Sequence, residues 1–253
     1  MQIILASAKI MRQQVDVTPP ITSRPLFQQS AAQFAVELSQ MPPADLAKAL
    51  HCCKDIALQN HQRYQCFFNE AERLPAVLAY FGQAYKYLNA HDFGNGDYQF
   101  AQEHLTLLSF LYGMLRPLDA IHPYRLEGKV KLQATSGLTL FDWWKDQLTD
   151  VLIERVKADD GILLHLATAE FEHLFHWKRV EQQVTVIKPL FLVDKGLEYK
   201  VVSMYAKGCR GAMARYVIKN KLTRPESLHC FSVDGFEYKP NMGDARHPHY
   251  IKQ

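Results

Sequence analysis

The stretch Gln2-Ile-Ile-Leu-Ala-Ser-Ala8 opens the chain with a run of apolar residues that ends at small ones. A second run of this kind is Gly161-Ile-Leu-Leu-His-Leu-Ala167. Short, continuously apolar runs bounded by small residues are typical of strands buried in a sheet. Helix-like patterns separate the two runs, so the sequence predicts a mixed α/β (α+β) fold, with helices surrounding a sheet.

Outward from these runs, apolar spacing and helix breakers predict helices at Ser30–Met41, Asp45–Leu50, Lys54–Phe67, Leu74–Leu88, Tyr98–Leu115 and Ala206–Leu222. Pro117 is expected to end the fifth helix, because proline lacks the amide donor, and Asp97 in the turn Asn95-Gly96-Asp97 is its expected N-cap. Further strands are expected at Val184–Val193 and Tyr199–Ala206, joined by a hairpin turn at Asp194-Lys-Gly196. No linker or repeat divides the chain, and we expect one domain, residues 1–253.

Composition excludes several classes of protein. Hydrophobic residues make up 48% of the 253 residues and charged residues 22%, which is typical of a globular chain and excludes disorder. The N-terminal apolar run is too short to cross a bilayer, and no later stretch approaches the length of about 18 residues that a span needs. The cysteines show no C-x-x-C spacing, so we expect reduced thiols, mostly buried, rather than disulfides or a zinc site: Cys52, Cys53, Cys66, Cys209 and Cys230. We therefore expect a cytoplasmic protein without membrane contact.

A basic segment near the C-terminus is the most informative feature of the charge distribution. The net charge is only +3. Between Tyr199 and Pro225, however, no acidic residue occurs and seven basic ones do: Lys200, Lys207, Arg210, Arg215, Lys219, Lys221 and Arg224. Such an asymmetry points to an anionic partner.

The predicted helix Ala206–Leu222 has two faces. Ala206, Cys209, Met213, Tyr216 and Val217 fall on the side expected to face the core. The cations fall on or beside the other face, together with Gly208, Gly211 and Ala214. Glycines disfavour helix interiors, so we interpret them as places where a phosphate or sugar approaches the backbone; the alternative is a solvated face with incidental glycines.

Several segments together resemble the YaaA peroxide-stress family. Ile3-Ile-Leu-Ala-Ser-Ala-Lys9 is similar to its N-terminal strand and SPAK-type turn. Leu107-Leu-Ser-Phe-Leu-Tyr-Gly-Met-Leu-Arg-Pro-Leu-Asp119 and His122-Pro-Tyr-Arg-Leu-Glu127 resemble its central signature. Leu166-Ala-Thr-x-Glu170-Phe171 and Tyr205-Ala-Lys-x-x-Arg-Gly-x-Met-Ala-Arg-Tyr216 resemble its C-terminal segments. The motifs follow in order through nearly the whole chain.

The resemblance implies one mixed α/β domain of unusual topology, with a basic cleft and a helix-hairpin-helix-like element. It also implies DNA binding, to double-stranded or branched forms, and a bacterial cytoplasmic role in limiting iron-dependent peroxide damage. The chain departs from the family pattern at Ser7, where the turn proline is expected, at Gln83, where an aspartate is expected, and at Gly208 and Cys209, where basic residues are expected.

The central signature contains two arginines beside two carboxylates. Arg116 and Asp119 flank the turn at Pro117, and Arg125 and Glu127 lie on the following loop. They form either an ion-pair network that fixes these loops or a cleft in which the arginines face phosphates.

Three functions remain open from the sequence. The first is a DNA-binding stress protein, monomeric and without a required cofactor, that contacts the DNA backbone through Lys9, Arg116, Arg125, Lys207, Arg210, Arg215, Lys219 and Lys221. The second is an enzyme acting on a nucleic-acid base or a phosphorylated metabolite in the same cleft; its candidate catalytic residues are Lys9, Asp119, Glu127 and Tyr205, with Arg125, Thr168 and Lys207 nearby.

The third is direct iron binding. Glu170-x-x-His173 has the spacing of di-iron proteins and His176 follows one turn later, but a second such motif is missing and no metal site is predicted. Nucleotide-binding glycine motifs and a serine nucleophile elbow are also missing, and Cys52 and Cys53 have no identifiable base.

Overall fold

The main sheet is parallel except at one edge. The computed structural model describes residues 1–253. The strand order is β6-β5-β1-β8-β9, with β1 at Gln2–Ala6, β5 at Leu105–Ser109, β6 at Gly113–Leu115, β8 at Ile162–Leu166 and β9 at Thr185–Ile187. Only β6 is antiparallel to its neighbour. Because β1 lies between β5 and β8, the chain changes sides at β1, and such a switch point opens a crevice at the carboxyl ends of the strands.

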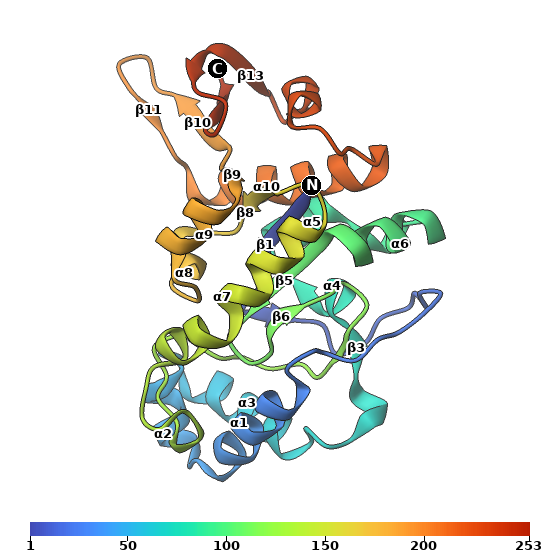
Figure 1. Cartoon of the computed structure of the whole chain (residues 1–253). Helices are drawn as coiled ribbons and strands as arrows, with labels where there is room; N and C mark the ends of the chain where they lie inside the picture. The colour runs from blue at the N-terminus through green and yellow to red at the C-terminus, as the bar shows by residue number, and fades with distance from the viewer.

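A second sheet forms the C-terminal part of the molecule (Figure 1). Its order is β11-β10-β14-β13-β12, with β10 at Leu190–Asp194, β11 at Tyr199–Lys200, β12 at Ser232–Val233, β13 at Phe236–Gly243 and β14 at Pro248–Lys252. Two short ladders pair β2 (Ile10–Met11) with β4 (Tyr80–Phe81) and β3 (Leu74–Pro75) with β7 (Ala120–Ile121). The first ladder fixes the chain that follows β1.

Helices surround the sheets. Three gather at the end of the molecule farthest from the second sheet (Figure 1): α1 (Gln28–Gln40), α2 (Pro43–Ala49) and α3 (Lys54–Gln65). The others are α4 (Ala76–Ala79), α5 (Gln83–Leu88), α6 (Asn95–His104), α7 (Leu140–Ala158), α8 (Ala169–Glu172), α9 (Trp177–Gln183) and α10 (Ser203–Asn220). Short 3-10 turns lie at Glu70–Glu72, Ala90–Asp92, Gln133–Thr135 and Pro225–Cys230.

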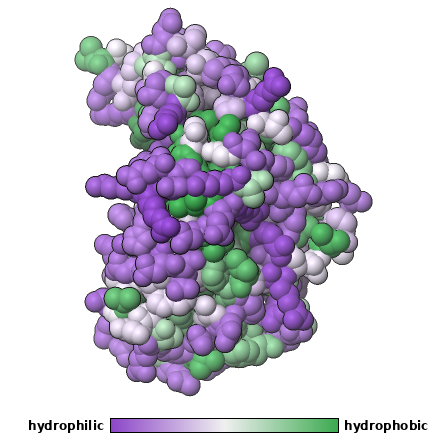
Figure 2. Space-filling model, viewed as in Figure 1, coloured by the Kyte–Doolittle hydropathy of each residue, from purple (hydrophilic) through white to green (hydrophobic).

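One cluster of 68 buried residues runs through the molecule. Hydrophilic residues cover most of the surface in Figure 2, and apolar surface is confined to small patches. None of the helices combines the length and hydropathy needed to cross a membrane.

The mixed α/β fold class is confirmed, and so are several elements. The two apolar runs that the sequence marked as strands are β1 and β8, and the first three predicted helices are α1, α2 and α3. The turn at Asp194-Lys-Gly196 joins antiparallel β10 and β11. The helix-hairpin-helix-like element implied by the family resemblance stays a prediction.

The helix predicted for Tyr98–Leu115 is wrong beyond His104. Residues 105–115 form β5 and β6, a hairpin whose Gly113 has φ +69° and lies against the Trp144 ring. A strand buried on both faces shows no alternation of polar and apolar residues, so its sequence resembles that of a buried helix. Asp97 is also not the N-cap: Gly94 holds that position, and Asp97 accepts a hydrogen bond from the Gly94 amide at 3.0 Å.

Three other boundaries differ from the prediction. Leu74–Leu88 is broken at Pro75 and Gly82 into β3, α4, β4 and α5, and the predicted strand Val184–Val193 divides into β9 and β10 in different sheets. The predicted strand Tyr199–Ala206 stops at Lys200, because α10 begins at Ser203.

The expectation that the cysteines are mostly buried is wrong: Cys209 is buried, Cys52 is half-buried, and the other three are exposed.

The glycines of α10 have a packing role, which corrects the phosphate interpretation. Gly208, Gly211 and Ala214 are buried, although they were placed on the polar face. A Cβ at Gly211 would lie 1.8 Å from the Ala84 carbonyl oxygen of α5, and one at Gly208 would lie 3.0 Å from the Tyr87 ring. Glycine is therefore required for the close approach of α10 to α5 rather than for a ligand.

Candidate functional site

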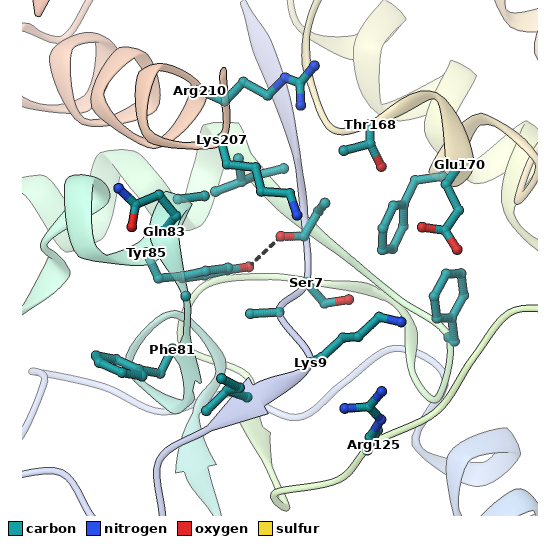
Figure 3. Close-up of a pocket in the computed structure, with 18 of the residues that line it drawn as sticks. Ser7, Lys9, Phe81, Gln83, Tyr85, Arg125, Thr168, Glu170, Lys207 and Arg210 are labelled. Carbon is teal, nitrogen blue, oxygen red and sulfur yellow. Dashed lines mark hydrogen bonds between the residues drawn. The ribbon is translucent and has the colours of Figure 1, made fainter. Parts of the chain in front are cut away.

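A cavity of about 310 Å³ lies at the carboxyl ends of the parallel strands (Figure 3). Ser7 and Lys9 reach it from the chain after β1, Phe110 from the end of β5, and Thr168 from the end of β8. Helix α10 adds Lys207 and Arg210, and Gln83 and Tyr85 come from α5. The cavity therefore occupies the crevice that the switch point at β1 creates.

Backbone contacts fix the chain that forms the cavity floor. The Ser7 amide donates to the Leu108 carbonyl at 3.0 Å, which a proline at this position could not do. The Tyr85 hydroxyl donates to the Ala6 carbonyl at 3.0 Å (Figure 3). These bonds join β1, β5 and α5 around the site.

Two cations on the lower side of the cavity share one carboxylate. The Lys9 Nζ donates to both oxygens of Glu127, at 2.8 and 2.9 Å, and the Arg125 Nη2 donates to Glu127 Oε1 at 3.3 Å. Glu127 is buried behind the wall, whereas the Lys9 side chain is 58% exposed. The Nε of Arg125 is buried without a hydrogen-bond partner. The signature carboxylate therefore orients Lys9 and Arg125 but neutralises only one of them.

Two cations on the α10 side have no carboxylate partner. Figure 3 shows Lys207 and Arg210 across the cavity from Lys9 and Arg125, with Glu170 on the wall between them. Burial lowers the pKa of the Arg210 guanidinium, although an arginine remains charged at neutral pH. Four cations against two carboxylates, Glu170 and Glu127, leave an excess of two positive charges. Such a cavity favours an anion.

Aromatic side chains form part of the cavity walls. Phe110 and Phe171 stack with ring centroids 4.7 Å apart, and both line the cavity. Tyr124 lies at its base, where its hydroxyl bonds Ser109 at 2.6 Å and Tyr80 at 2.7 Å. Burial raises the pKa of Tyr124 to about 12, so this hydroxyl stays protonated and can donate. A flat or apolar group attached to an anion would fit these walls.

Three of the predicted DNA-binding cations lie in the C-terminal half of α10 and at its C-cap, Lys221. The Arg215 guanidinium donates to both carboxylate oxygens of Asp92 at 2.6 Å, while Lys219 and Lys221 bond Asp97 at 2.9 and 2.6 Å. Hydrogen bonds from these lysines lower the pKa of Asp97 to about 2, although burial raises it. These cations hold α10 against α6 and the preceding turn.

Two predicted catalytic residues also lie outside the cavity. Asp119 is buried in a separate hollow, where it accepts from Ser23 and from the backbone amide and guanidinium of Arg116. Tyr205 is 42% exposed and packs near Phe236. The structure therefore brings together Lys9, Arg125, Thr168 and Lys207, with Glu127 behind them, but neither Asp119, Tyr205 nor Arg116.

The departures from the family pattern fall at or near the cavity. Ser7 and Gln83 line it, and an acid at Gln83 would remove one unit of its excess charge. Gly208 and Cys209 are buried in α10, and burial raises the pKa of the Cys209 thiol to about 12.

The sequence gave no indication that Tyr124 and the aromatic walls belong to the site, although Tyr124 lies inside the central signature.

The Glu170, His173 and His176 side chains do not converge. Glu170 lines the cavity, His173 packs edge-on against Phe141, and His176 bonds Asp146 at 2.8 Å. No three His, Cys, Asp or Glu side chains come together in a metal-binding arrangement. The geometry therefore offers no observation in favour of direct iron binding.

The fold and the site define an α/β protein with a cationic, aromatic-walled cavity at the carboxyl ends of a parallel sheet. A family model described as "Peroxide stress protein YaaA" matches residues 1–242. The chain is 44% identical to a UPF0246 protein of Bacteroides thetaiotaomicron, over 97% of this chain and 96% of the relative. It is 42% identical to one of Phocaeicola vulgatus (99% and 98% covered) and 37% identical to one of Hahella chejuensis (97% and 96%).

The chain therefore belongs to the YaaA peroxide-stress family, as the sequence motifs indicated.

Proposed function

We propose that this peroxide-stress protein binds DNA through the sugar–phosphate backbone, in the cytoplasm, and thereby limits iron-dependent damage. The observation that carries the proposal is the pair Lys207 and Arg210, which face Lys9 and Arg125 across the cavity without a carboxylate partner. Phosphate is the anion that a DNA backbone presents, and lysine and arginine are its usual ligands.

The geometry favours a limited contact rather than a long basic groove. Arg215, Lys219 and Lys221 are paired with Asp92 and Asp97, so α10 and its C-cap offer two free cations rather than five. A contact of this size suits a site where the backbone is distorted, such as a junction or an unpaired nucleotide, more than a long duplex. DNA preference should therefore depend on shape rather than on base sequence.

Binding of duplex and four-way-junction DNA at several salt concentrations tests the proposal. The Lys207→Glu/Arg210→Glu variant should bind much more weakly, and the slope of log K against log salt should fall by about two units. The matched control is Lys54→Glu/Lys178→Glu, which changes the net charge equally at exposed lysines that make no hydrogen bond or ion pair. Equal affinities of the folded double variant and the control would refute the proposed site.

A second candidate function is an enzyme that acts on a nucleic-acid base or a phosphorylated metabolite in the same cavity. The aromatic walls and the volume of about 310 Å³ favour it, since a flat base fits there while its phosphate meets the cations. Binding of nucleoside monophosphates, compared with inorganic phosphate, tests this candidate. Equal affinity for the two ligands would show that the walls contribute nothing to recognition.

A further inference from the structure

A second hollow with an excess of positive charge lies apart from the cavity. It holds about 280 Å³ and contains the arginines Arg24, Arg116 and Arg155, the aspartate Asp119 and an apolar wall that includes Leu26 and Val151. It shares no residue with the cavity described above. The sequence placed Arg116 in a cleft with Arg125, and the hollow gives Arg116 different neighbours.

The hollow lies at the β6 edge of the main sheet, because Met114 belongs to β6 and Arg116 and Asp119 follow that strand. Arg155 of α7 donates through Nε to the Gln2 side chain at 3.0 Å, and Gln2 begins β1. The cavity reaches β1 at Leu5 and Ala6, where the strand ends. The two hollows have no lining residue in common, and Gln2 and Leu5 lie roughly 10 Å apart along β1, at about 3.3 Å per residue. A ligand in one site therefore does not occupy the other.

The single carboxylate of the hollow is already saturated. Asp119 Oδ1 accepts from Ser23 Oγ at 2.6 Å and from Arg116 Nη2 at 3.1 Å, while Oδ2 accepts from the Arg116 amide at 2.8 Å. Burial raises the pKa of Asp119 in spite of these bonds. Three guanidinium groups therefore face one fully engaged carboxylate, and two positive charges remain without a counter-ion in the protein.

Arg116 and Arg155 are held in place by hydrogen bonds, yet both keep free donors, and the third arginine, Arg24, is exposed. Arg155 Nη2 donates to the Gln102 and Glu103 carbonyls at 3.4 and 3.2 Å, and Arg116 uses Nε and Nη2 on Asp119. The Nη1 groups of both make no hydrogen bond within the protein, and neither does the Arg24 guanidinium. Burial and the nearby Arg116 charge lower the pKa of Arg155, whereas the Asp119 carboxylate raises it.

We propose that this hollow binds a phosphoryl group through Arg24, Arg116 and Arg155. Two of the arginines also have a structural role: Arg116 fixes the turn at Pro117, and Arg155 fixes the end of α6. The Arg24 guanidinium makes no hydrogen bond that would give it such a role. Planar guanidinium groups with free Nη donors match the oxygens of a phosphoryl group. The shared chemistry fits either a small phosphorylated molecule or a phosphate of the DNA backbone.

Arginine Nε resonances in a ¹⁵N-resolved NMR titration with inorganic pyrophosphate test the proposal. The titration uses the full chain carrying Lys207→Ala/Arg210→Ala, so that the cavity lacks the two cations that have no carboxylate partner. The Arg116 and Arg155 signals should shift, and Arg24→Ser should weaken binding roughly tenfold, as expected for the loss of one charge-assisted contact. Lys178→Ser, which removes an exposed lysine without partners, should leave the affinity unchanged.

Adding duplex DNA instead of pyrophosphate identifies the source of the phosphoryl group. Shifts of the same signals with DNA assign the site to a backbone phosphate, and shifts with pyrophosphate alone assign it to a small molecule. Unmoved Arg116 and Arg155 signals with both probes would overturn the proposal, and so would an affinity unaffected by Arg24→Ser. Because the readout is the Arg116 and Arg155 signals of the hollow, and the two unpaired cations of the cavity are already removed, failure here leaves the DNA-binding proposal at the cavity untouched.

Discussion

Replacing Gly211 with alanine should force α10 away from α5. The new Cβ would lie 1.8 Å from the Ala84 carbonyl oxygen and 2.6 Å from its carbon, and both are backbone atoms that cannot rotate aside. Restoring ordinary contact requires the helices to separate by more than about 1 Å. Overpacking of this severity costs about 3 kcal/mol or more, and the better helix propensity of alanine offsets about 1 kcal/mol. The free energy of unfolding should therefore fall by about 2 kcal/mol or more.

Thermal unfolding followed by circular dichroism measures the effect. A loss of this size lowers Tm by roughly 4–8 °C in a chain of this length. Gly96→Ala is the matched control, since nothing lies within 4 Å of its Cβ and it should be neutral or slightly stabilising. Gly208→Ala should lie between them, because its Cβ would meet the Tyr87 ring at 3.0 Å and a ring can turn.

The same substitution should weaken anion binding. Helix α10 carries Lys207 and Arg210, while α5 carries Gln83, and all three line the cavity between the helices. Separating the helices widens the cavity and lengthens every contact across it. A Gly211→Ala protein as stable as Gly96→Ala, with unchanged DNA affinity, would refute both the packing argument and the link between α10 and the site.

Three further predictions concern charge. Asp97→Asn should destabilise the fold at pH 7 but not near pH 2. The pKa of Asp97 is about 2 in the folded protein, against about 3.9 in the unfolded chain. The Asp97 carboxylate therefore stabilises the fold above about pH 4, and this stabilisation is lost as the pH falls through 2. Urea unfolding at both pH values measures this, and a pH-independent difference would contradict it. Glu127→Gln should lower stability, because Arg125 loses its counter-ion, yet steepen the salt dependence of DNA binding by about one unit as Lys9 is released. Gln83→Glu should weaken DNA binding by placing a carboxylate in the cavity, whereas Gln83→Asn should not; equal effects would show that size rather than charge matters.

Much of the site was predictable from local sequence. The sequence offered seven residues at strand ends and on constrained loops as candidates for one pocket. Lys9, Arg125, Thr168 and Lys207 line the cavity, whereas Glu127 lies behind its wall and Asp119 and Tyr205 lie elsewhere. Parallel strands end at the same edge of a sheet, so residues just after them converge whatever the details of the helices. The aromatic walls were not foreseen, since Phe110 and Phe171 meet only when β5 and β8, on either side of β1, end at the same edge of the sheet.

The secondary structure of residues 105–115 shows a different limit. Apolar residues alone cannot distinguish a helix from a strand buried on both faces. The decision rests on Gly113, whose positive φ makes the turn and whose missing side chain admits the Trp144 ring. That contact comes from α7, and a local pattern contains no information about it.

The sequence by itself determined the family, the mixed α/β class and the strands β1 and β8, because each of these depends on residues close together in the chain. Only the tertiary structure decided which cations of the basic segment are free to bind an anionic ligand. The segment from Tyr199 to Pro225 has no acid of its own, yet Asp92 and Asp97, more than 100 residues earlier, engage Arg215, Lys219 and Lys221. Coulomb energy depends on distance in space rather than along the chain, so Lys207 and Arg210 remain free while their neighbours on α10 do not.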